Sequence, residues 1–305
     1  MLRSAVVPSL AKINLDLRVL HKRPDGFHEL RTVFQTISLG DRLGIEYTPG
    51  RGPTSVSITG NVDIPNNLIL RAADAILDST GAKGTVTFKL DKQIPMGGGL
   101  GGGSSNAAAV LLALPVLLGK IVKPAKLHEI AAELGSDVPF FLYGGTALGL
   151  GRGTELFPLA DAPPARGLLV TPGIHVSTPD AYRALNRKPG ASLAPPVYFD
   201  PADWATTGSN DFEAAVYSQH PALKTIANKL KRAGATTVRM SGSGSSIFSI
   251  FSDTALEAPT LQRFKGFHLL PVTFVSRRKY QSLWWNSLKR HTLIKEWPPR
   301  SRYAQ

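Results

Sequence analysis

A run of glycines at residues 97–103 carries the most specific chemical signal in the sequence. The stretch reads PMGGGLGGGSSNAA from Pro95, so six of the seven residues in the run are glycine, and two serines follow. Glycine loses more backbone freedom on folding than any other residue, so such a run is expected where side chains do not fit. The apolar residues after Ser105 predict a helix, whose positive end would converge with backbone N–H groups and serine hydroxyls. We interpret the run as a cradle for an anion such as phosphate, with a close-packing turn as the alternative.

Two common nucleotide-binding loops do not match this run. A Walker loop places a lysine before its Ser or Thr, whereas here Gly103 precedes Ser104, so the phosphate-binding lysine is missing. The G-x-G-x-x-G spacing of a dinucleotide loop is present, but so many glycines satisfy it trivially, and Val122 stands about 20 residues further on where an acid is expected. A flexible linker is disfavoured because a strand-like segment precedes the run and a helix-like segment follows it. The run is therefore expected to be another kind of phosphate loop.

The composition indicates a globular chain without disulfides or a membrane span. Hydrophobic residues make up 43% of the 305 residues and cysteine is absent, so a large core is possible, whereas a thiolate, a disulfide or a Cys-bound metal is not. The longest apolar stretch, 107–119, is interrupted by Pro115 and is shorter than the roughly 18 residues that a membrane span needs. Since no segment resembles a secretory signal, we expect a cytoplasmic protein.

The net charge of +13 is concentrated near the C-terminus. Residues 276–305 contain eight Lys or Arg and one Glu, so this segment carries +7 and the first 275 residues carry +6. Basic residues mixed with aromatic ones are typical of nucleic-acid binders. Basic extensions are more often solvated or in contact with another subunit, so a nucleic-acid-binding module is kept as an alternative only. A monomer or a homodimer is expected.

Hydrophobic spacing predicts a β-rich first half. Apolar residues alternate with polar ones from residue 9 to residue 20, as in a strand, and this places Lys12 and Asn14 on the polar face. Further strands and a helix capped before Leu68 lead to the glycine run. The helix after the run is expected to kink or end at Pro115.

The second half alternates between helices and strands, which suggests an open-faced sandwich. A composition shift near LADAPPARG, residues 159–167, predicts the boundary between the two halves. We therefore divide the chain into residues 1–160, residues 161–283, and a basic aromatic extension at residues 284–305.

The glycine run and two further motifs resemble those of the GHMP kinases. AKINL near the N-terminus and RMSGSGSSIF near the C-terminus occur in the order of that superfamily, and the resemblance covers about residues 9–285. Residues 11–43 and 134–153 are similar in particular to the members that phosphorylate the 2-hydroxyl of a cytidine-diphosphate-linked methylerythritol, in the non-mevalonate route to isoprenoid precursors. A different acceptor, such as mevalonate or homoserine, remains the alternative.

The resemblance implies an α+β fold of two domains, with ATP and Mg²⁺ as cofactors. The N-terminal domain is expected to be β-rich and to bind ATP, and the C-terminal domain to be a ferredoxin-like open-faced sandwich. The partner is expected to be a small molecule with a cytidine diphosphate group. No motif of the sequence names a Mg²⁺ ligand, although Ser104 or Ser105 could contribute an oxygen.

The same resemblance assigns catalysis to Lys12 and Asp137. Lys12 belongs to AKINL and would lie beside the acceptor hydroxyl, and Asp137 of SDVPFF has the position of the catalytic aspartate. A carboxylate there can orient the hydroxyl and accept its proton, while a fixed ammonium can stabilise the developing charge. On local grounds alone, Lys12 is an ordinary solvated lysine and Asp137 an N-cap.

The remaining site residues are implied by the resemblance as well. Phe27, which is often tyrosine in the family, and His28 would contact the cytosine end, and Tyr182 would stack on the base. Locally, a turn histidine and a half-buried helix tyrosine explain the last two equally well. The substrate-binding set is Asn14, Phe27, His28, Asp137, Tyr182 and Gly242, the last in a second glycine turn. The expected ATP contacts are Asn67, Leu68, Lys92, Pro95, Gly97, Gly98, Gly99, Leu100, Gly101, Gly102, Gly103, Ser104, Ser105 and Asn106. For Asn67, Leu68 and Lys92, the local alternatives are a helix cap, a core residue and a solvated lysine.

Overall fold

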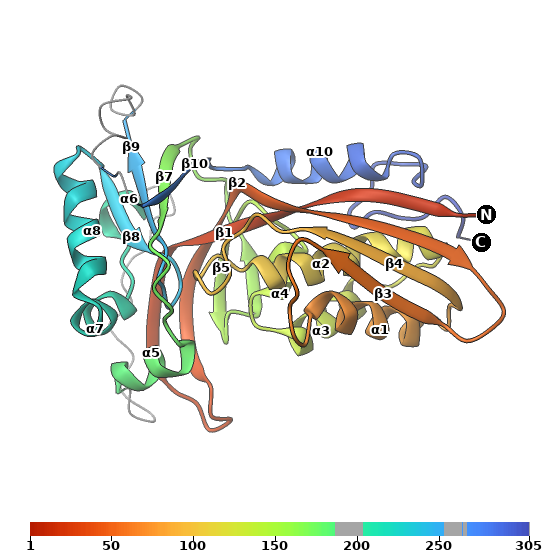
Figure 1. Cartoon of the computed structure of the whole chain (residues 1–305), viewed down its shortest axis with the longest axis horizontal. Helices are drawn as coiled ribbons and strands as arrows, with labels where there is room; N and C mark the ends of the chain where they lie inside the picture. The colour runs from red at the N-terminus through yellow and green to blue at the C-terminus, as the bar shows by residue number, and fades with distance from the viewer. Residues whose placement is uncertain (187–203, 253–263, 265–266, 305) are drawn as a thin grey trace.

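The fold consists of two β-sheets with helices packed on them (Figure 1). The structure is a computed structural model and describes residues 1–186, 204–252, 264 and 267–304. The α+β class with two domains is confirmed. No helix in these ranges combines the length and the apolar character that crossing a membrane requires.

The first sheet is built on two very long strands. Strand β1 (Arg3–Lys22) pairs with β2 (His28–Pro49) in an antiparallel hairpin. The other edge of β2 pairs with both β4 and β5, so the sheet order is β3-β4-β2-β5-β6 with β1 beside β2. The shorter strands are β3 (Ser55–Gly60), β4 (Gly84–Asp91), β5 (Thr146–Gly151) and β6 (Glu155–Pro158).

Both faces of strand β1 are covered, which the alternation in the sequence did not indicate. Ala11 and Ile13 are fully buried against the second sheet, as an apolar face should be. Lys12 and Asn14 on the opposite face are only 3% exposed each. The local alternative of a solvated lysine at position 12 is therefore wrong, because helices from later in the chain cover the polar face.

Four helices cover one face of the first sheet. Helix α2 (Gly102–Leu118) lies at their centre and is buried from Ser105 onward, as expected for a helix that is apolar on all sides. The flanking helices are α1 (Leu68–Thr80), α3 (Pro124–Leu134) and α4 (Val138–Phe141). Their apolar side chains form one core with strands β2 and β4.

Helix α2 continues past Pro115, so this residue does not end the helix, which was one of the two expected outcomes. The helix ends three residues later at Leu118, and Gly119 follows with a φ of 76°. Proline lacks the N–H of other helix residues, but the carbonyl of Pro115 still accepts a hydrogen bond from Lys120 N at 3.0 Å. A proline in the last turn is thus compatible with the helix, and a left-handed glycine provides the actual stop.

The second sheet has four antiparallel strands in the order β10-β7-β9-β8. Numbered along the chain this order is 4-1-3-2, the arrangement of a ferredoxin-like sandwich. One face, with Leu168 and Val170, packs on helices, and the other, with Leu169, packs toward the first sheet. The strands are β7 (Arg166–Thr171), β8 (Thr237–Met240), β9 (Ile247–Phe251) and β10 (His268–Thr273). The helices are α5 (Thr178–Leu185), α6 (Trp204–Thr207), α7 (Phe212–Gln219) and α8 (Pro221–Arg232).

The C-terminal extension packs back onto the first sheet. Helix α10 (Arg277–Leu288) runs along this sheet toward the end where both termini lie (Figure 1). Its Tyr280 hydroxyl donates to Phe141 O at 2.6 Å, and Trp297 Nε1 donates to Leu142 O at 2.9 Å. Because α10 passes through residue 283, the extension predicted to begin at 284 starts inside a helix. The proline-rich stretch around residues 189–201 lies outside the described residues.

Candidate active site

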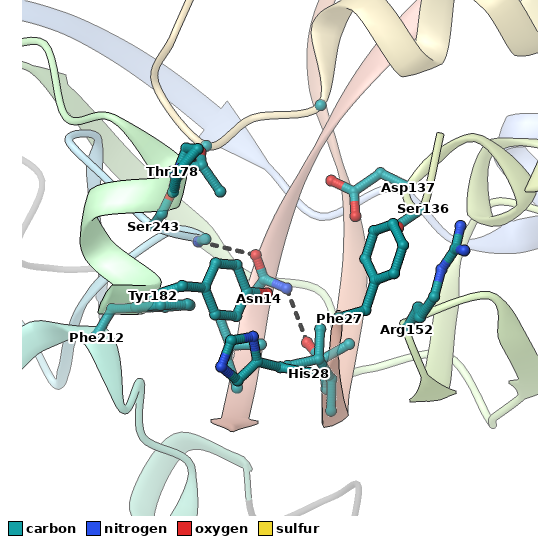
Figure 2. A pocket seen from close by; sticks show the side chains of 18 of the residues that line it. Asn14, Phe27, His28, Ser136, Asp137, Arg152, Thr178, Tyr182, Phe212 and Ser243 are labelled. Atoms are coloured by element: carbon teal, nitrogen blue, oxygen red, sulfur yellow. Dashed lines mark hydrogen bonds between the residues drawn. The ribbon is translucent and has the colours of Figure 1, made fainter. Parts of the chain in front are cut away.

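A cleft of about 810 Å³ lies where the two sheets meet. Its walls come from strands β1 and β2, the glycine loop, the start of helix α4, helix α5 and the glycine turn that follows β8 (Figure 2). The cleft brings together ten of the residues that the sequence predicted, which are Lys12, Asn14, Phe27, His28, Gly99, Gly101, Ser104, Asp137, Tyr182 and Gly242. Segments that are far apart in the sequence therefore share one cavity.

Lys12 and Asp137 form an ion pair in this cleft. Lys12 Nζ lies 3.2 Å from Asp137 Oδ2, and the two side chains are 4% and 33% exposed. Although Asp137 stands at the N-cap of α4, its side chain makes no capping hydrogen bond. The capping alternative therefore does not account for the carboxylate, which is one-third exposed and paired with a buried cation.

Asn14 fixes the position of the lysine. Its Oδ1 accepts hydrogen bonds from Lys12 Nζ at 2.8 Å and from Gly242 N at 2.9 Å, while its Nδ2 donates to Thr32 Oγ1 at 2.8 Å. Figure 2 shows Asn14 between the second glycine turn and strand β2. These hydrogen bonds hold the Lys12 ammonium in position beside the Asp137 carboxylate.

The glycine loop combines left-handed backbone with close packing. Gly97, Gly99 and Gly101 have φ values of 69°, 74° and 69°, a region that favours glycine. A Cβ at Gly99 would overlap Ser241 O, and one at Gly101 would lie 2.8 Å from the Phe141 ring. The loop therefore needs these glycines for packing, as the close-packing alternative expected. The interpretation as a phosphate cradle stays a prediction.

The start of helix α2 is open for an anion. Gly101 is its N-cap and no side chain caps it, so the first-turn N–H groups and the positive helix end are available to a ligand. Ser104, in the first turn, lines the cleft. The main chain of this loop is also attached to β1, because Lys12 N donates to Leu100 O at 3.0 Å.

Buried polar side chains on both sides of the glycine loop hold the loop in place. Lys92 Nζ pairs with Asp41 at 2.7 Å, with side chains 6% and 0% exposed. The same carboxylate accepts from the backbone N–H groups of Gln93 and Ile94 at 2.7 Å each and from Asn106 Nδ2 at 2.9 Å. Burial lowers the pKa of Lys92 from its usual value, and Asp41 opposes this effect. The local alternative of a solvated lysine at position 92 is therefore wrong.

Several other predicted ATP contacts have their side chains turned away from the cleft. Ser105 is 2% exposed and accepts a hydrogen bond from Ser9 Oγ at 2.8 Å. Asn67 caps α1 by accepting from Ile69 N at 3.0 Å, and Leu68 begins that helix. The predicted residues outside the cleft lining are Asn67, Leu68, Lys92, Pro95, Gly97, Gly98, Leu100, Gly102, Gly103, Ser105 and Asn106. Any contact of theirs with ATP stays a prediction.

Aromatic side chains line the end of the cleft away from the glycine loop. His28 and Tyr182 are stacked, with ring centroids 4.6 Å apart and an interplanar angle of 20°. Across the cleft, the Arg152 guanidinium lies 4.0 Å from the centre of the Phe27 ring (Figure 2). Burial, together with the charge of Lys22, lowers the pKa of His28, so the neutral ring is favoured. In this structure His28 therefore occupies one face of Tyr182, the ring on which the base was expected to stack.

Sequence reasoning missed several polar residues of the site. Asp41, Thr32 and Arg152 come from the two halves of strand β2 and from the turn after β5. Thr178 Oγ1 and Ser243 Oγ, both at the cleft, are hydrogen-bonded at 2.8 Å. None of these side chains has a distinctive local pattern, because each acquires its partner through the long-range fold.

The described residues contain no group of three or more His, Cys, Asp or Glu side chains that could hold a metal alone. The cleft offers the Asp137 carboxylate and the Ser104 hydroxyl. Mg²⁺ is usually held by substrate phosphates together with one or two protein oxygens and several waters. This sparse donor set therefore fits a magnesium ion that arrives on a nucleotide.

Comparisons with known proteins identify the fold. The family models "GHMP kinases N terminal domain" and "GHMP kinases C terminal" match residues 67–145 and 201–262. A solved homoserine kinase from Cytophaga hutchinsonii shares the fold with a TM-score of 0.65 and 19% identity, covering 90% of this chain and 95% of that one. The fold is that of a GHMP kinase.

More similar relatives narrow the family further. A 4-diphosphocytidyl-2-C-methyl-D-erythritol kinase of Solibacter usitatus is 49% identical over 99% of this chain and 98% of its own. A kinase of the same name from Pelotomaculum thermopropionicum is 41% identical over 84% of this chain and 92% of its own. A crystal structure of 4-(cytidine 5'-diphospho)-2C-methyl-D-erythritol kinase matches with a TM-score of 0.73 and 36% identity, covering 90% of this chain and 99% of that one. The chain belongs to the family of 4-diphosphocytidyl-2-C-methyl-D-erythritol kinases.

Proposed function

We propose that this protein transfers the γ-phosphoryl group of ATP to the 2-hydroxyl of 4-diphosphocytidyl-2-C-methyl-D-erythritol, in the non-mevalonate route to isoprenoid precursors. The observation that carries the proposal is the Lys12–Asp137 ion pair, which lies in one cleft between a glycine loop and a group of aromatic rings. The identity of 49% to a relative with this name supports the same acceptor. Mevalonate and homoserine kinases are similar at only 12% and 19% identity, which supports the fold alone.

The Asp137 carboxylate is assigned as the general base. Its one-third exposure lets an acceptor hydroxyl reach it, whereas Lys12 is buried behind it. As the acceptor oxygen bonds to the γ-phosphorus, its proton passes to Asp137, the bond from the γ-phosphorus to the β–γ bridging oxygen breaks, and ADP leaves. Lys12 keeps the carboxylate oriented and stabilises negative charge on the reacting oxygens.

The glycine loop and the first turn of α2 are assigned to the phosphates of ATP. Uncapped N–H groups at a helix start bind anions, and the backbone of Gly99 and Gly101 lines the cleft beside this helix start. Mg²⁺, bound to these phosphates and to Asp137 or Ser104, would neutralise charge during the transfer. The buried ion pair of Lys92 with Asp41 holds the segment just before the glycine loop in place.

The aromatic end of the cleft is assigned to the cytidine group. Phe27 is 48% exposed and lies across the cleft from Tyr182 (Figure 2), so the two rings offer apolar faces to a base. Because His28 is stacked on Tyr182, we expect either that His28 moves when the base binds or that the base adds to the stack. The acceptor hydroxyl would then be directed toward Asp137.

The proposal is tested by coupled measurement of ADP release. The wild-type protein is supplied with MgATP and, in separate reactions, with the cytidyl acceptor, mevalonate or homoserine at equal concentrations. We expect release above the ATP-only background with the cytidyl acceptor alone. Turnover of mevalonate or homoserine in the absence of turnover of the cytidyl acceptor contradicts the proposal. A parallel titration with single-stranded DNA at low and high salt tests the nucleic-acid alternative, which predicts binding that weakens steeply with salt.

A further inference from the structure

Asn210 is a buried residue outside the cleft whose side chain is fully engaged. It is 5% exposed and lies two residues before helix α7. Its Nδ2 donates to Met240 O and to Gly242 O, both at 2.8 Å, and its Oδ1 accepts from Phe212 N at 2.9 Å. A buried amide that uses both of its donors on one turn fixes the backbone of that turn.

The turn held by Asn210 is the second glycine turn, which contacts both halves of the candidate site. Gly242 N donates to Asn14 Oδ1, the same oxygen that accepts from Lys12 Nζ. Ser241 Oγ donates to Gly99 O of the glycine loop at 2.9 Å. A shift of this turn therefore changes the environment of the lysine and of the glycine loop.

Asn210 is itself attached to the strand that carries the lysine. Leu17 N donates to Ser209 O at 2.8 Å, Asp211 N donates to Leu17 O at 3.0 Å, and Ser209 N donates to Asp16 Oδ1 at 2.9 Å. The segment 209–211 is thus docked along β1, five residues beyond Lys12. Asn210 thus connects β1 to the second glycine turn. Asn14, on β1 itself, connects the same two elements through a separate hydrogen bond.

We propose that Asn210 is a positioning residue for phosphoryl transfer: by holding the carbonyls of Met240 and Gly242, it keeps Gly242 N–H on Asn14 and so directs the Lys12 ammonium at Asp137. This inference rests on the proposed kinase function. It gives a role in the reaction to a residue that touches neither the cleft nor any expected ligand.

The substitution Asn210→Asp isolates the two donors. The aspartate keeps an oxygen that can accept from Phe212 N, but it turns a second oxygen toward two carbonyls, which repels them. We expect kcat to fall about 10- to 100-fold, as for other small displacements of a catalytic group, and KM for ATP and for the cytidyl acceptor to change much less. Asn286→Asp, the same chemical change on the exposed side of α10, is the matched control and is expected to leave kcat unchanged.

A double-mutant cycle separates positioning from general loss of structure. If Asn210 acts through Asn14, then Asn14→Ala combined with Asn210→Asp loses no more kcat than Asn14→Ala alone. Losses that multiply in the double variant overturn the inference, and so does a wild-type kcat for Asn210→Asp. Should Asn210→Asp fail to fold, Asn210→Ser, which retains one donor, enters the same cycle with the same criteria.

Amide hydrogen exchange at Gly242 in the free protein tests the contact without any substrate. Asn210→Asp is expected to speed exchange at Gly242, while Asn286→Asp leaves it unchanged. Unchanged exchange at Gly242 in Asn210→Asp contradicts the inference even if the wild type fails to phosphorylate the cytidyl acceptor. Failure of the inference and failure of the proposed function are therefore distinguishable.

Discussion

The substitution Asp137→Asn tests the role of the ion pair most sharply. Asparagine has the shape of aspartate but cannot accept a proton at neutral pH, so the acceptor hydroxyl loses its general base. General bases contribute about 10²- to 10⁴-fold to rate, which corresponds to roughly 3–5 kcal/mol of barrier. We expect kcat to fall by that factor, with KM for both substrates within about threefold of wild type because the glycine loop and the aromatic end of the cleft are unchanged.

The structure also predicts that Asp137→Asn is not a folding defect. The carboxylate is 33% exposed and makes no capping bond to α4, so solvent screens its pairing with Lys12. The free energy of unfolding should change by no more than about 1 kcal/mol. The assay is coupled ADP release at saturating MgATP and acceptor, with a thermal melt of the same sample. A kcat within tenfold of wild type would refute Asp137 as the base, and a large loss of stability would refute the reasoning about its exposure.

Three further predictions concern the loop, its support and the aromatic end of the cleft. Gly101→Ala, at a φ of 69° with a Cβ 2.8 Å from the Phe141 ring, should raise KM for ATP in the ADP-release assay and lower stability by at least about 1 kcal/mol. Asp41→Asn leaves the buried Lys92 without its carboxylate and should lower the free energy of urea unfolding by about 3 kcal/mol. Because the pKa of His28 is lowered in the folded state, the unfolded chain binds more protons, so stability should fall as pH drops below 6.5. The usual pKa of histidine is about 6.5. His28→Asn removes this contribution, so the free energy of urea unfolding should decrease less from pH 7.5 to pH 5 in this variant than in wild type.

Matched controls make these predictions specific. Gly81→Ala has a φ of 60° but no atom within 4 Å of the new Cβ, so it should lower stability without changing KM for ATP. Equal effects of Gly81→Ala and Gly101→Ala on that KM would count against the loop assignment. Asp78→Asn on the exposed side of α1 should leave unfolding unchanged. Loss of stability on acidification that is the same in wild type and His28→Asn would contradict the pH argument.

Local sequence features were sufficient to predict the elements that begin and end with a distinct residue. Helix α1 follows the Asn67 cap and stops at left-handed Gly81. The composition of the glycine run predicted a loop before a helix, and α2 starts within that run at Gly102. Such signals act over a few residues, so they are readable without tertiary structure.

Features that depend on long-range packing were not predictable in the same way. The polar face of β1 indicated a solvated lysine, yet later helices bury Lys12 to 3% exposure. Asp41 has no local signature, because its side-chain partners lie 51 or more residues away in sequence. The two carbonyls that Asn210 Nδ2 holds lie 30 and 32 residues away, so this link was not predictable either. The resemblance to a family supplied Lys12 and Asp137, whereas the side chains that hold them became visible only in the fold.

The proposed reaction passes the γ-phosphoryl group from ATP to the cytidyl acceptor in this cleft. A single-turnover reaction with γ-labelled ATP, excess wild-type protein and the cytidyl acceptor tests it directly, with separation of the products. We expect one label to enter the acceptor for each ADP formed, and Asp137→Asn to slow this transfer. Label recovered as inorganic phosphate, or transfer at an equal rate in Asp137→Asn, would contradict it.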